Sequence, residues 1–510
     1  MQYRRVRLGI DFGTTRTVVA CADRGNYPVL AFVDDNGDSH DWIPSVVADR
    51  DGDLAFGFDA LAQTAHEQKP VVRSFKRLLA ESEARPDRRI QIGRISIPLA
   101  DLIARFLEHV KEAILERSTL KEELKNEPMR SVVAVPANAS GAQRLLTLDA
   151  FRRAGLAPVA MLNEPSAAGF EYTHRHRSTL TSKRDHVVVY DLGGGTFDAS
   201  LVRMRGLQHE VLTTAGDNRL GGDDFDQVIL DLVLKAAGSP KDVDLVALRE
   251  QCREAKERLN PSSKKLTVEV NDTPVSVPVQ EIYDACTPLV ERSIEAMLPV
   301  MQRLDGSESE GVERDDIAGI YVVGGASELP IVGRALKARF GRRVHRSPYA
   351  SGAIAIGLAI ACDEAAGFEL IDRYTRTFGV FREGEGGNAI TFDPIFTRET
   401  VLPAAGAAPI AFRRRYRAAH NVGHYRFLEC SAMDDTGRPR GHMVYSGDVL
   451  FPFEPRLVPK AGELGGIQVT RMTGEGPRIE EEYTLDEHGI VAVRIKNLDA
   501  DFERIFRIGA

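Results

Sequence analysis

The sequence is poor in cysteine and has neither a long apolar run nor more than one tryptophan. Its five cysteines are Cys21, Cys252, Cys286, Cys362 and Cys430. They lack the spacing of a metal site and are typical of small buried residues in a reducing compartment. No apolar run approaches the roughly 20 residues of a membrane span, and Met1–Arg5 leads directly into a predicted strand without a signal-peptide pattern. We therefore expect a cytoplasmic protein with no membrane partner.

An excess of basic charge is also lacking. The 66 Lys and Arg residues against 74 Asp and Glu residues give a net charge of −8, which indicates no general affinity for nucleic acid. The most basic short run, Arg413–Arg417, predicts a solvated strand face. With 43% hydrophobic and 27% charged residues, the composition is that of a globular protein, and the length predicts roughly three to four domains.

The most informative stretch lies between Val187 and Met204. Val187–Tyr190 is an apolar run that predicts a strand buried on both faces, and it ends in Asp191. The tip that follows contains Gly193, Gly194, Gly195, Thr196 and Asp198. Bare N–H groups at such a tip suit a phosphate, and carboxylates suit the magnesium that accompanies it. By itself the stretch is equally compatible with a glycine-rich turn that only reverses the chain.

A second copy of this layout favours the phosphate site. Residues 7–20 also predict two strands joined by a tip. The first strand contains Asp11, and the tip contains Gly13, Thr14 and Thr15. Two such hairpins at a domain-sized separation predict a duplicated lobe, with a phosphate held between the copies.

The rest of the first 362 residues fits two α/β lobes. Each hairpin is followed by strand–turn–helix units, at 132–154 in the first half and at 320–340 in the second. Helical patterns are predicted at Phe58–Glu67, Val71–Ala80 and Leu99–Leu115. From about Thr377 the alternation is of the β type.

This pattern predicts three parts. Residues 1–366 form a nucleotide-binding domain, with lobe I at about 1–180 and lobe II at about 181–366. Residues 367–376 form a linker, and residues 377–510 form a β-rich domain without a helical lid.

Several motifs in this order resemble the seventy-kilodalton heat-shock chaperones, the DnaK-like family. They are Ile10–Thr15, Val135–Ala137, Gln143-Arg144, Asn163–Ala168, Asp191–Asp198, Leu220–Asp226 and Val323–Gly325. The resemblance implies the actin-like (ribonuclease H-like) ATPase fold, with duplicated lobes followed by a smaller β-sandwich-like domain. It covers about residues 1–362 well and the β domain loosely.

The resemblance also implies a site for ATP or ADP with Mg²⁺. Asp11 and Asp191 would hold magnesium through waters, and Lys76, Glu164, Asp191 and Thr196 would take part in catalysis. Nucleotide contacts would come from Gly13, Thr14, Thr15, Gly193, Gly194, Gly195, Thr196, Asp198, Gly221, Gly222, Lys256, Gly324 and Gly325. Pro136 and Arg144 would relay the nucleotide state to the β domain. Without the resemblance, Lys76 and Arg144 would read as solvated helix residues.

Three positions depart from the family pattern around the nucleoside. Arg253 replaces a ribose-binding Glu, while Glu257 and Glu328 replace two arginines that stack on adenine. Losing both stacks would weaken binding on the order of 10- to 100-fold. We expect ATP binding with looser base recognition. The segment Phe368–Asp372, with Glu369 interrupting its apolar residues, also departs from the family's leucine-rich linker.

The resulting functional hypothesis is an ATP-dependent chaperone in protein folding and the stress response. Its implied partners are unfolded polypeptides, a J-domain co-chaperone and a nucleotide exchange factor. Without a lid, we expect weak and rapidly exchanging client binding. One alternative is a nucleotide-dependent switch with little hydrolysis and one dedicated partner. A sugar kinase of the same fold and a filament-forming protein rank lower, because neither has an obvious use for the β domain.

Overall fold

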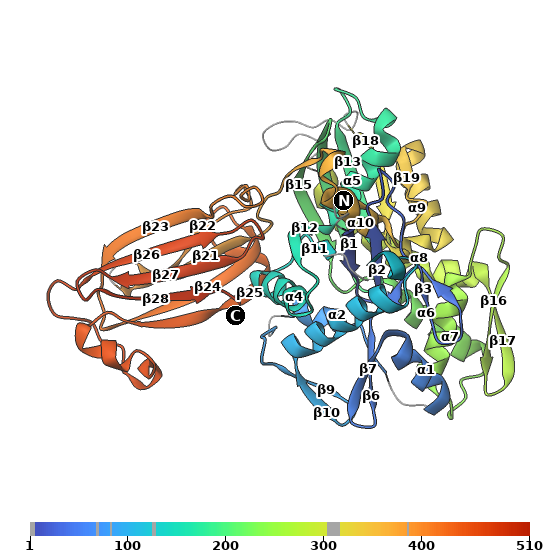
Figure 1. Cartoon of the computed structure of the whole chain (residues 1–510), viewed down its shortest axis with the longest axis horizontal. Helices are drawn as coiled ribbons and strands as arrows, with labels where there is room; N and C mark the ends of the chain where they lie inside the picture. The colour runs from blue at the N-terminus through green and yellow to red at the C-terminus, as the bar shows by residue number, and fades with distance from the viewer. Residues whose placement is uncertain are drawn as a thin grey trace.

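The two hairpins lie in two separate sheets that face each other across a cleft. The computed structural model describes residues 6–67, 71–81, 84–124, 129–302, 317–384 and 387–509. Two α/β lobes carry a β domain at one side, and α4 lies next to β25 at the junction (Figure 1). No helix in these ranges is both long and apolar enough to cross a membrane.

Lobe I is built on a five-stranded sheet in the order β12-β11-β1-β2-β5. The strands are β1 (Val6–Phe12), β2 (Arg16–Cys21), β5 (Ile43–Pro44), β11 (Met129–Val135) and β12 (Pro158–Asn163). The helices are α1 (Gly57–Glu67), α2 (Leu99–Glu116), α3 (Lys121–Leu124), α4 (Gly141–Arg153) and α5 (Glu164–His176), with 3₁₀ turns η1 (Phe75–Ala80) and η2 (Arg177–Thr179). Shorter strands are β3 (Phe32–Val33), β4 (Ser39–His40), β6 (Val46–Arg50), β7 (Asp53–Phe56), β8 (Val71–Arg73), β9 (Arg89–Ile92) and β10 (Ile95–Pro98). The β1–β2 pair is the first predicted hairpin.

Lobe II repeats this plan with a six-stranded sheet in the order β19-β18-β13-β14-β15-β20. The strands are β13 (His186–Leu192), β14 (Phe197–Arg205), β15 (Gln208–Asp217), β18 (Ile317–Val323), β19 (Val344–Arg346) and β20 (Glu369–Ile371), and a separate hairpin comprises β16 (Lys265–Val270) and β17 (Thr273–Pro278). The helices are α6 (Gly222–Ala236), α7 (Leu245–Glu257), α8 (Val279–Gln302), α9 (Pro330–Phe340) and α10 (Ala353–Cys362), with 3₁₀ turns η5 (Gly325–Glu328), η6 (Gly341–Arg343) and η7 (Glu364–Ala366). The β13–β14 pair is the second predicted hairpin, so the duplicated α/β lobes are confirmed.

Strand β20 lies inside the predicted linker. It pairs in parallel with the first residues of β15, so it is the edge strand of the lobe II sheet. Phe368 packs against Phe170 of α5 and His209 of β15. The segment between the lobes and the β domain is therefore anchored to lobe II.

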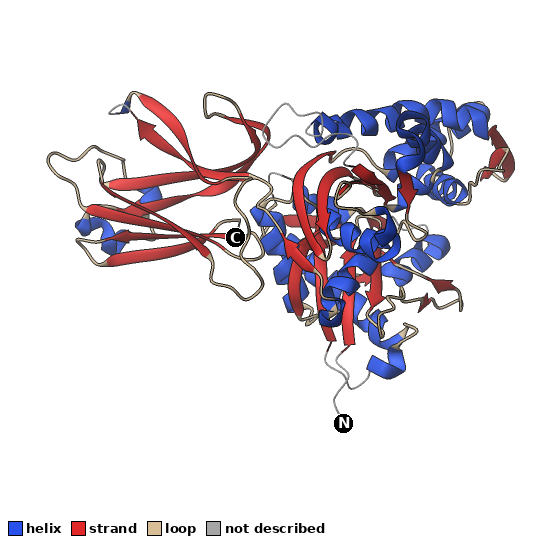
Figure 2. Ribbon diagram, turned by 90° about the horizontal axis from the view of Figure 1, so that it is seen from above, coloured by secondary structure: helices blue, strands red, loops and turns tan. Residues whose placement is uncertain are grey.

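The β domain is a sandwich of two antiparallel sheets, in the orders β22-β21-β24-β25 and β23-β26-β27-β28, seen as two stacked layers of strands in Figure 2. The strands are β21 (Thr377–Gly384), β22 (Ala389–Phe396), β23 (Ile410–Arg417), β24 (Val422–Met433), β25 (Pro439–Pro452), β26 (Arg478–Leu485), β27 (Val491–Asn497) and β28 (Phe502–Arg507), with 3₁₀ turns η9 (Pro455–Lys460) and η10 (Leu464–Gly466). Inward-facing residues of both sheets share one core. The basic run of β23 pairs with acidic residues, including Arg413 with Glu482 and Arg415 with Glu480.

One helix prediction is wrong. The stretch Val71–Ala80 forms strand β8 and then the 3₁₀ turn η1, with a break at Ser74. Ser74 has a positive φ of 55°, which a continuous helix does not allow. The break turns Lys76 into the cleft. The expectation of buried cysteines is confirmed, because all five are buried and free.

The close approach of α5 and α10 generates the first prediction. A Cβ on Gly357 of α10 would overlap the carbonyl oxygen of Ala167 on α5. We expect Gly357→Ala to force the helices apart and to lower the free energy of unfolding by about 1–3 kcal/mol, measured by urea denaturation. Gly333→Ala is the matched control, because it lies inside α9 with nothing near its added Cβ. It should raise stability by about 0.5–1 kcal/mol. Equal effects of the two variants would contradict this packing argument.

Candidate nucleotide site between the lobes

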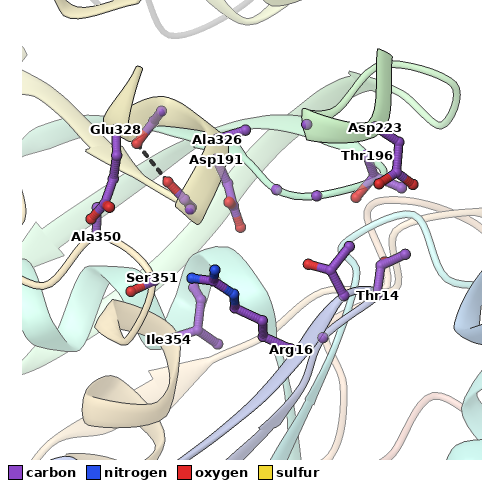
Figure 3. A pocket seen from close by; sticks show the side chains of 18 of the residues that line it. Thr14, Arg16, Asp191, Thr196, Asp223, Ala326, Glu328, Ala350, Ser351 and Ile354 are labelled. Atoms are coloured by element: carbon purple, nitrogen blue, oxygen red, sulfur yellow. Dashed lines mark hydrogen bonds between the residues drawn. The ribbon is translucent and has the colours of Figure 1, made fainter. Parts of the chain in front are cut away.

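A cavity of about 920 Å³ lies between the two lobes and receives both hairpin tips. Figure 3 shows Thr14 of the first tip facing Thr196 of the second, with Glu328 at the opposite end of the cavity. Of the predicted site residues, the cavity is lined by Asp11, Gly13, Thr14, Thr15, Lys76, Glu164, Asp191, Gly193, Gly194, Thr196, Gly222, Lys256, Gly324 and Gly325. The fold thus gathers residues from distant parts of the chain into one site.

Three predicted residues lie just behind the cavity wall. Gly195 accepts a hydrogen bond at its carbonyl from Arg77 Nη2 at 2.7 Å. Gly221 donates its N–H to Asp224 at the start of α6 at 2.8 Å. Asp198 is buried on β14, opposite Asp191 in the hairpin register. These residues support the second tip rather than face the cavity.

The two tips approach each other so closely that side chains are excluded. An added Cβ on Gly194 would lie 2.5 Å from Thr15 Oγ1 of the other tip. An added Cβ on Gly195 would lie 2.5 Å from Arg77 Nε and 2.9 Å from Thr14 Cγ2. The glycines therefore let backbone N–H groups and threonine hydroxyls share a narrow space, which is the arrangement that phosphate oxygens require.

Lys76 and Glu164 form a buried pair at the floor of the cavity. Lys76 Nζ donates to Glu164 Oε1 at 3.1 Å, and only 7% of Lys76 is exposed. Burial alone would lower the pKa of Lys76, but Glu164 and Asp11 hold it above its ordinary value. Lys76 is therefore a charged lysine inside the cleft, and the reading as a surface lysine is excluded.

Carboxylates outnumber the cations around this pair. Burial raises the pKa of Asp11 to about 7, and the neighbouring Glu164 adds to this rise. Burial, Glu164 and Asp198 raise the pKa of Asp191 well above its usual range. Lys76 is the cation that opposes both shifts. The site thus has an excess of negative charge that a bound cation would relieve.

The residues present fit a magnesium ion that keeps its waters. Among the described residues, no group of three His, Cys, Asp or Glu side chains could enclose a metal directly. Magnesium commonly keeps several waters and uses one or two carboxylates together with substrate phosphates. Asp11 and Asp191 at the two tips supply that number of carboxylates.

The contacts between the two lobes at this site were not predicted from the sequence. Asp223 of α6 accepts from Ser74 Oγ at 3.0 Å and lies 3.5 Å from Arg77 Nη2. Arg16 of β2 reaches Glu257 of α7, with Nη2 2.5 Å from Oε2. Such pairs join residues far apart in the chain, and no local sequence pattern signals them.

The cavity reaches the junction with the β domain, where Arg376 at the end of the linker and His442 and Val444 of β25 line its far side. Arg376 Nε lies 3.3 Å from Glu429 Oε2, and each side chain is 1% exposed. Arg376 also donates to the carbonyl of Asn138, and Glu429 accepts from the Gly141 N–H at the start of α4. This buried ion pair fastens the β domain to lobe I.

A second series of polar contacts starts beside the floor of the cavity. Asn163, the neighbour of Glu164, donates to both carboxylate oxygens of Asp372 at 2.7 Å. Arg144 is 1% exposed and donates to Asn163 Oδ1 at 2.5 Å and to the carbonyl of His488 at 3.2 Å. The predicted relay residue Arg144 therefore touches lobe I and the β domain at once, while Pro136 lines the cavity.

Comparison with known proteins agrees with this architecture. The family model described as Hsp70 protein matches residues 7–407. The chaperone protein HscA of Escherichia coli O17:K52:H18 is 33% identical over 427 residues, which cover 79% of this chain and 65% of the relative. HscA of Escherichia fergusonii gives the same identity and coverage. The chain belongs to the Hsp70 family, and it spans about two thirds of the length of these curated relatives.

The buried Arg376–Glu429 pair generates the second prediction. Arg376→Met leaves the Glu429 charge buried and unpaired, which costs about 3–5 kcal/mol in the docked arrangement. We expect the β domain to separate and trypsin to cleave the chain after Arg373 at least tenfold faster. The double variant Arg376→Met/Glu429→Met removes both charges and should recover part of the protection. Unchanged cleavage of the single variant would show that the pair does not hold the domains together.

Proposed function

We propose that the chain is an ATP-dependent chaperone that hydrolyses ATP between its lobes and couples hydrolysis to polypeptide binding by the β domain. The main support for this proposal is that one cavity is lined by both hairpin tips together with Lys76 and Glu164. Membership of the Hsp70 family supports the same reading.

The two tips are suited to grip the phosphates from opposite sides. Thr14 and Thr15 offer hydroxyl and N–H groups from lobe I, and the second tip offers the Gly194 N–H and the Thr196 hydroxyl from lobe II. Gly193 lines the cavity, while its N–H donates to the carbonyl of Thr196 within the tip. Asp11 and Asp191 would hold Mg²⁺ through waters. When bound, the ion would neutralise charge that develops on the phosphate oxygens. Lys256, paired with Asp226 at 2.6 Å, stands beside the nucleoside end.

Phosphoryl transfer to water needs positioning and charge neutralisation more than covalent chemistry. Glu164 would accept a hydrogen bond from the attacking water and orient it. Lys76 lies between Glu164 and Asp11 and would stabilise negative charge in the transition state. Thr196, at the second tip, would donate to the terminal phosphate.

The connection between the site and the β domain runs through neighbouring residues. Glu164 faces the cavity, and Asn163 holds Asp372 of the linker. A shift at the start of α5 on hydrolysis would move both contacts. This arrangement supports coupling through Asp372 and Arg144, although Glu369 interrupts the apolar linker segment.

The partners in this proposal are extended segments of unfolded proteins, a J-domain co-chaperone and a nucleotide exchange factor. The E. coli relative is named a chaperone protein, which supports a client-binding role. A cytoplasmic setting and a part in the stress response belong to the same proposal. Five buried free cysteines support a reducing compartment.

The alternative is a nucleotide-dependent switch with little hydrolysis and one dedicated partner. The carboxylates Glu257 and Glu328 at the nucleoside end of the cavity favour weaker nucleotide binding than in the family pattern. The two functions differ in whether varied unfolded polypeptides accelerate hydrolysis.

Single-turnover hydrolysis of ATP with Mg²⁺, with and without a denatured client, tests the proposal. We expect slow hydrolysis that client accelerates and that Asp11→Asn lowers at least 100-fold, because one tip carboxylate is lost without a change of shape. Ser239→Ala, at an exposed position away from the cleft, is the control and should leave the rate unchanged.

Two results would contradict the chaperone proposal. Hydrolysis that is indifferent to every client would support the switch. Hydrolysis no faster than that of Asp11→Asn would show that the site does not perform this chemistry.

A further inference from the structure

At the nucleoside end of the cavity, this chain has an arginine that comes from lobe I. In the family pattern, the base-stacking arginines come from lobe II. Arg16 opens β2 directly after Thr14 and Thr15, and its side chain lines the cavity. Figure 3 shows its guanidinium projecting from the strand end toward Ser351 of lobe II. A nucleotide with its phosphates on Thr14 and Thr15 would therefore extend along Arg16.

Arg16 is fixed in place from two sides. Its Nη2 lies 2.5 Å from Glu257 Oε2 across the cleft, and the side chain is 22% exposed. Its guanidinium carbon lies 4.3 Å from the centroid of Trp42. Trp42 in turn packs against Phe58, with ring centroids 5.9 Å apart. The guanidinium plane is thus supported by an indole on one face and oriented by a carboxylate at its edge.

Glu257 also engages a second arginine. Arg253 Nε lies 3.7 Å from Glu257 Oε1, and Arg253 Nη2 lies 3.5 Å from Glu250. Arg253 is 9% exposed, and its Nε has no hydrogen-bond partner. The carboxylate at position 257 is therefore flanked by two guanidinium groups at the nucleoside end.

Apart from its arginine side chains, the cavity offers few flat surfaces for a base. Among its described lining residues there is no Phe, Tyr or Trp, and the one imidazole, His442, comes from the β domain. In the family pattern a base-stacking arginine stands at position 257, where this chain has Glu. Arg16 brings a guanidinium to the same point from lobe I, within hydrogen-bonding distance of that Glu.

We propose that Arg16 is a nucleoside-contacting residue that stacks its open face on the purine base, with Trp42 behind it and Glu257 holding its plane. The inference rests on the proposed nucleotide binding and assigns the base contact to lobe I. Base recognition would then draw the lobes together, because Arg16 and Glu257 belong to opposite walls of the cleft.

Binding of Mg-ADP and of Mg-pyrophosphate, measured by calorimetry, tests the role of Arg16. Arg16→Ala should weaken ADP binding about 3- to 30-fold, the range of an arginine–aromatic stack. Pyrophosphate binding should stay within about twofold. Arg16→Lys keeps the charge but loses the flat group, so it should behave like Arg16→Ala. Arg339→Ala, which removes an exposed guanidinium of α9 outside the cavity lining, is the matched control and should leave ADP binding unchanged.

A rescue variant separates a direct contact from a structural role. Arg16→Ala/Glu257→Arg returns a guanidinium to the same point from α7 and should recover most of the lost ADP affinity. Trp42 is the only tryptophan, so its fluorescence reports the contact independently. ADP should change the emission of the unsubstituted protein, pyrophosphate should change it much less, and Arg16→Ala should abolish the ADP response.

The outcomes distinguish the inference from the proposed function. Equal losses of ADP and pyrophosphate binding in Arg16→Ala would overturn the inference, because Arg16 would then contact phosphate. Unchanged ADP binding would also overturn it and would leave the proposed nucleotide binding intact. Failure of the unsubstituted protein to bind either ligand would overturn both.

Discussion

The pairing of Lys76 with Glu164 at the bottom of the cleft is the constraint on which the site depends. A lysine in this position is stable only because carboxylates surround it, and those carboxylates come from the ends of β1, β12 and β13. The strand ends of both sheets must therefore meet at one point. The duplication of the hairpin achieves this, because each copy ends its first strand in an aspartate.

The position of Glu164 at the floor of the cavity also explains where the β domain is attached. Glu164 and Asn163 are neighbours, so the residue that faces the cavity and the residue that holds the linker belong to one turn of chain. The attachment combines charges and hydrogen bonds, with Arg376 and Glu429 almost wholly buried, and an apolar contact of Ile490 with the lobe I core. Polar contacts of this kind are lost steeply when one partner moves, since an unpaired buried charge is costly. The junction is therefore suited to two distinct arrangements rather than to gradual loosening.

The sequence predicted the parts of the fold that rest on local pattern. The hairpins, α2, α4 and α9 follow apolar periodicity, glycine placement and capping, as with Ser140 accepting from the N–H of Gln143. The helical prediction for Val71–Ala80 failed although the apolar spacing was helical. Ser74 has a positive φ and donates its hydroxyl to Asp223 across the cleft, and no local pattern signals either feature. The site was predictable where the hairpin repeats. The pair between Arg16 and Glu257, 241 positions apart, was not predictable from local pattern, because only the folded lobes bring them together.

Strand β20 gives the linker a second role. While Glu369–Ile371 is paired in parallel with Gln208–Glu210, the first residues of β15 on that edge of the lobe II sheet are covered. Release of the linker would leave β15 with a bare edge, which is a template for any extended chain. The position of the linker thus decides whether this end of β15 is available to pair with another chain.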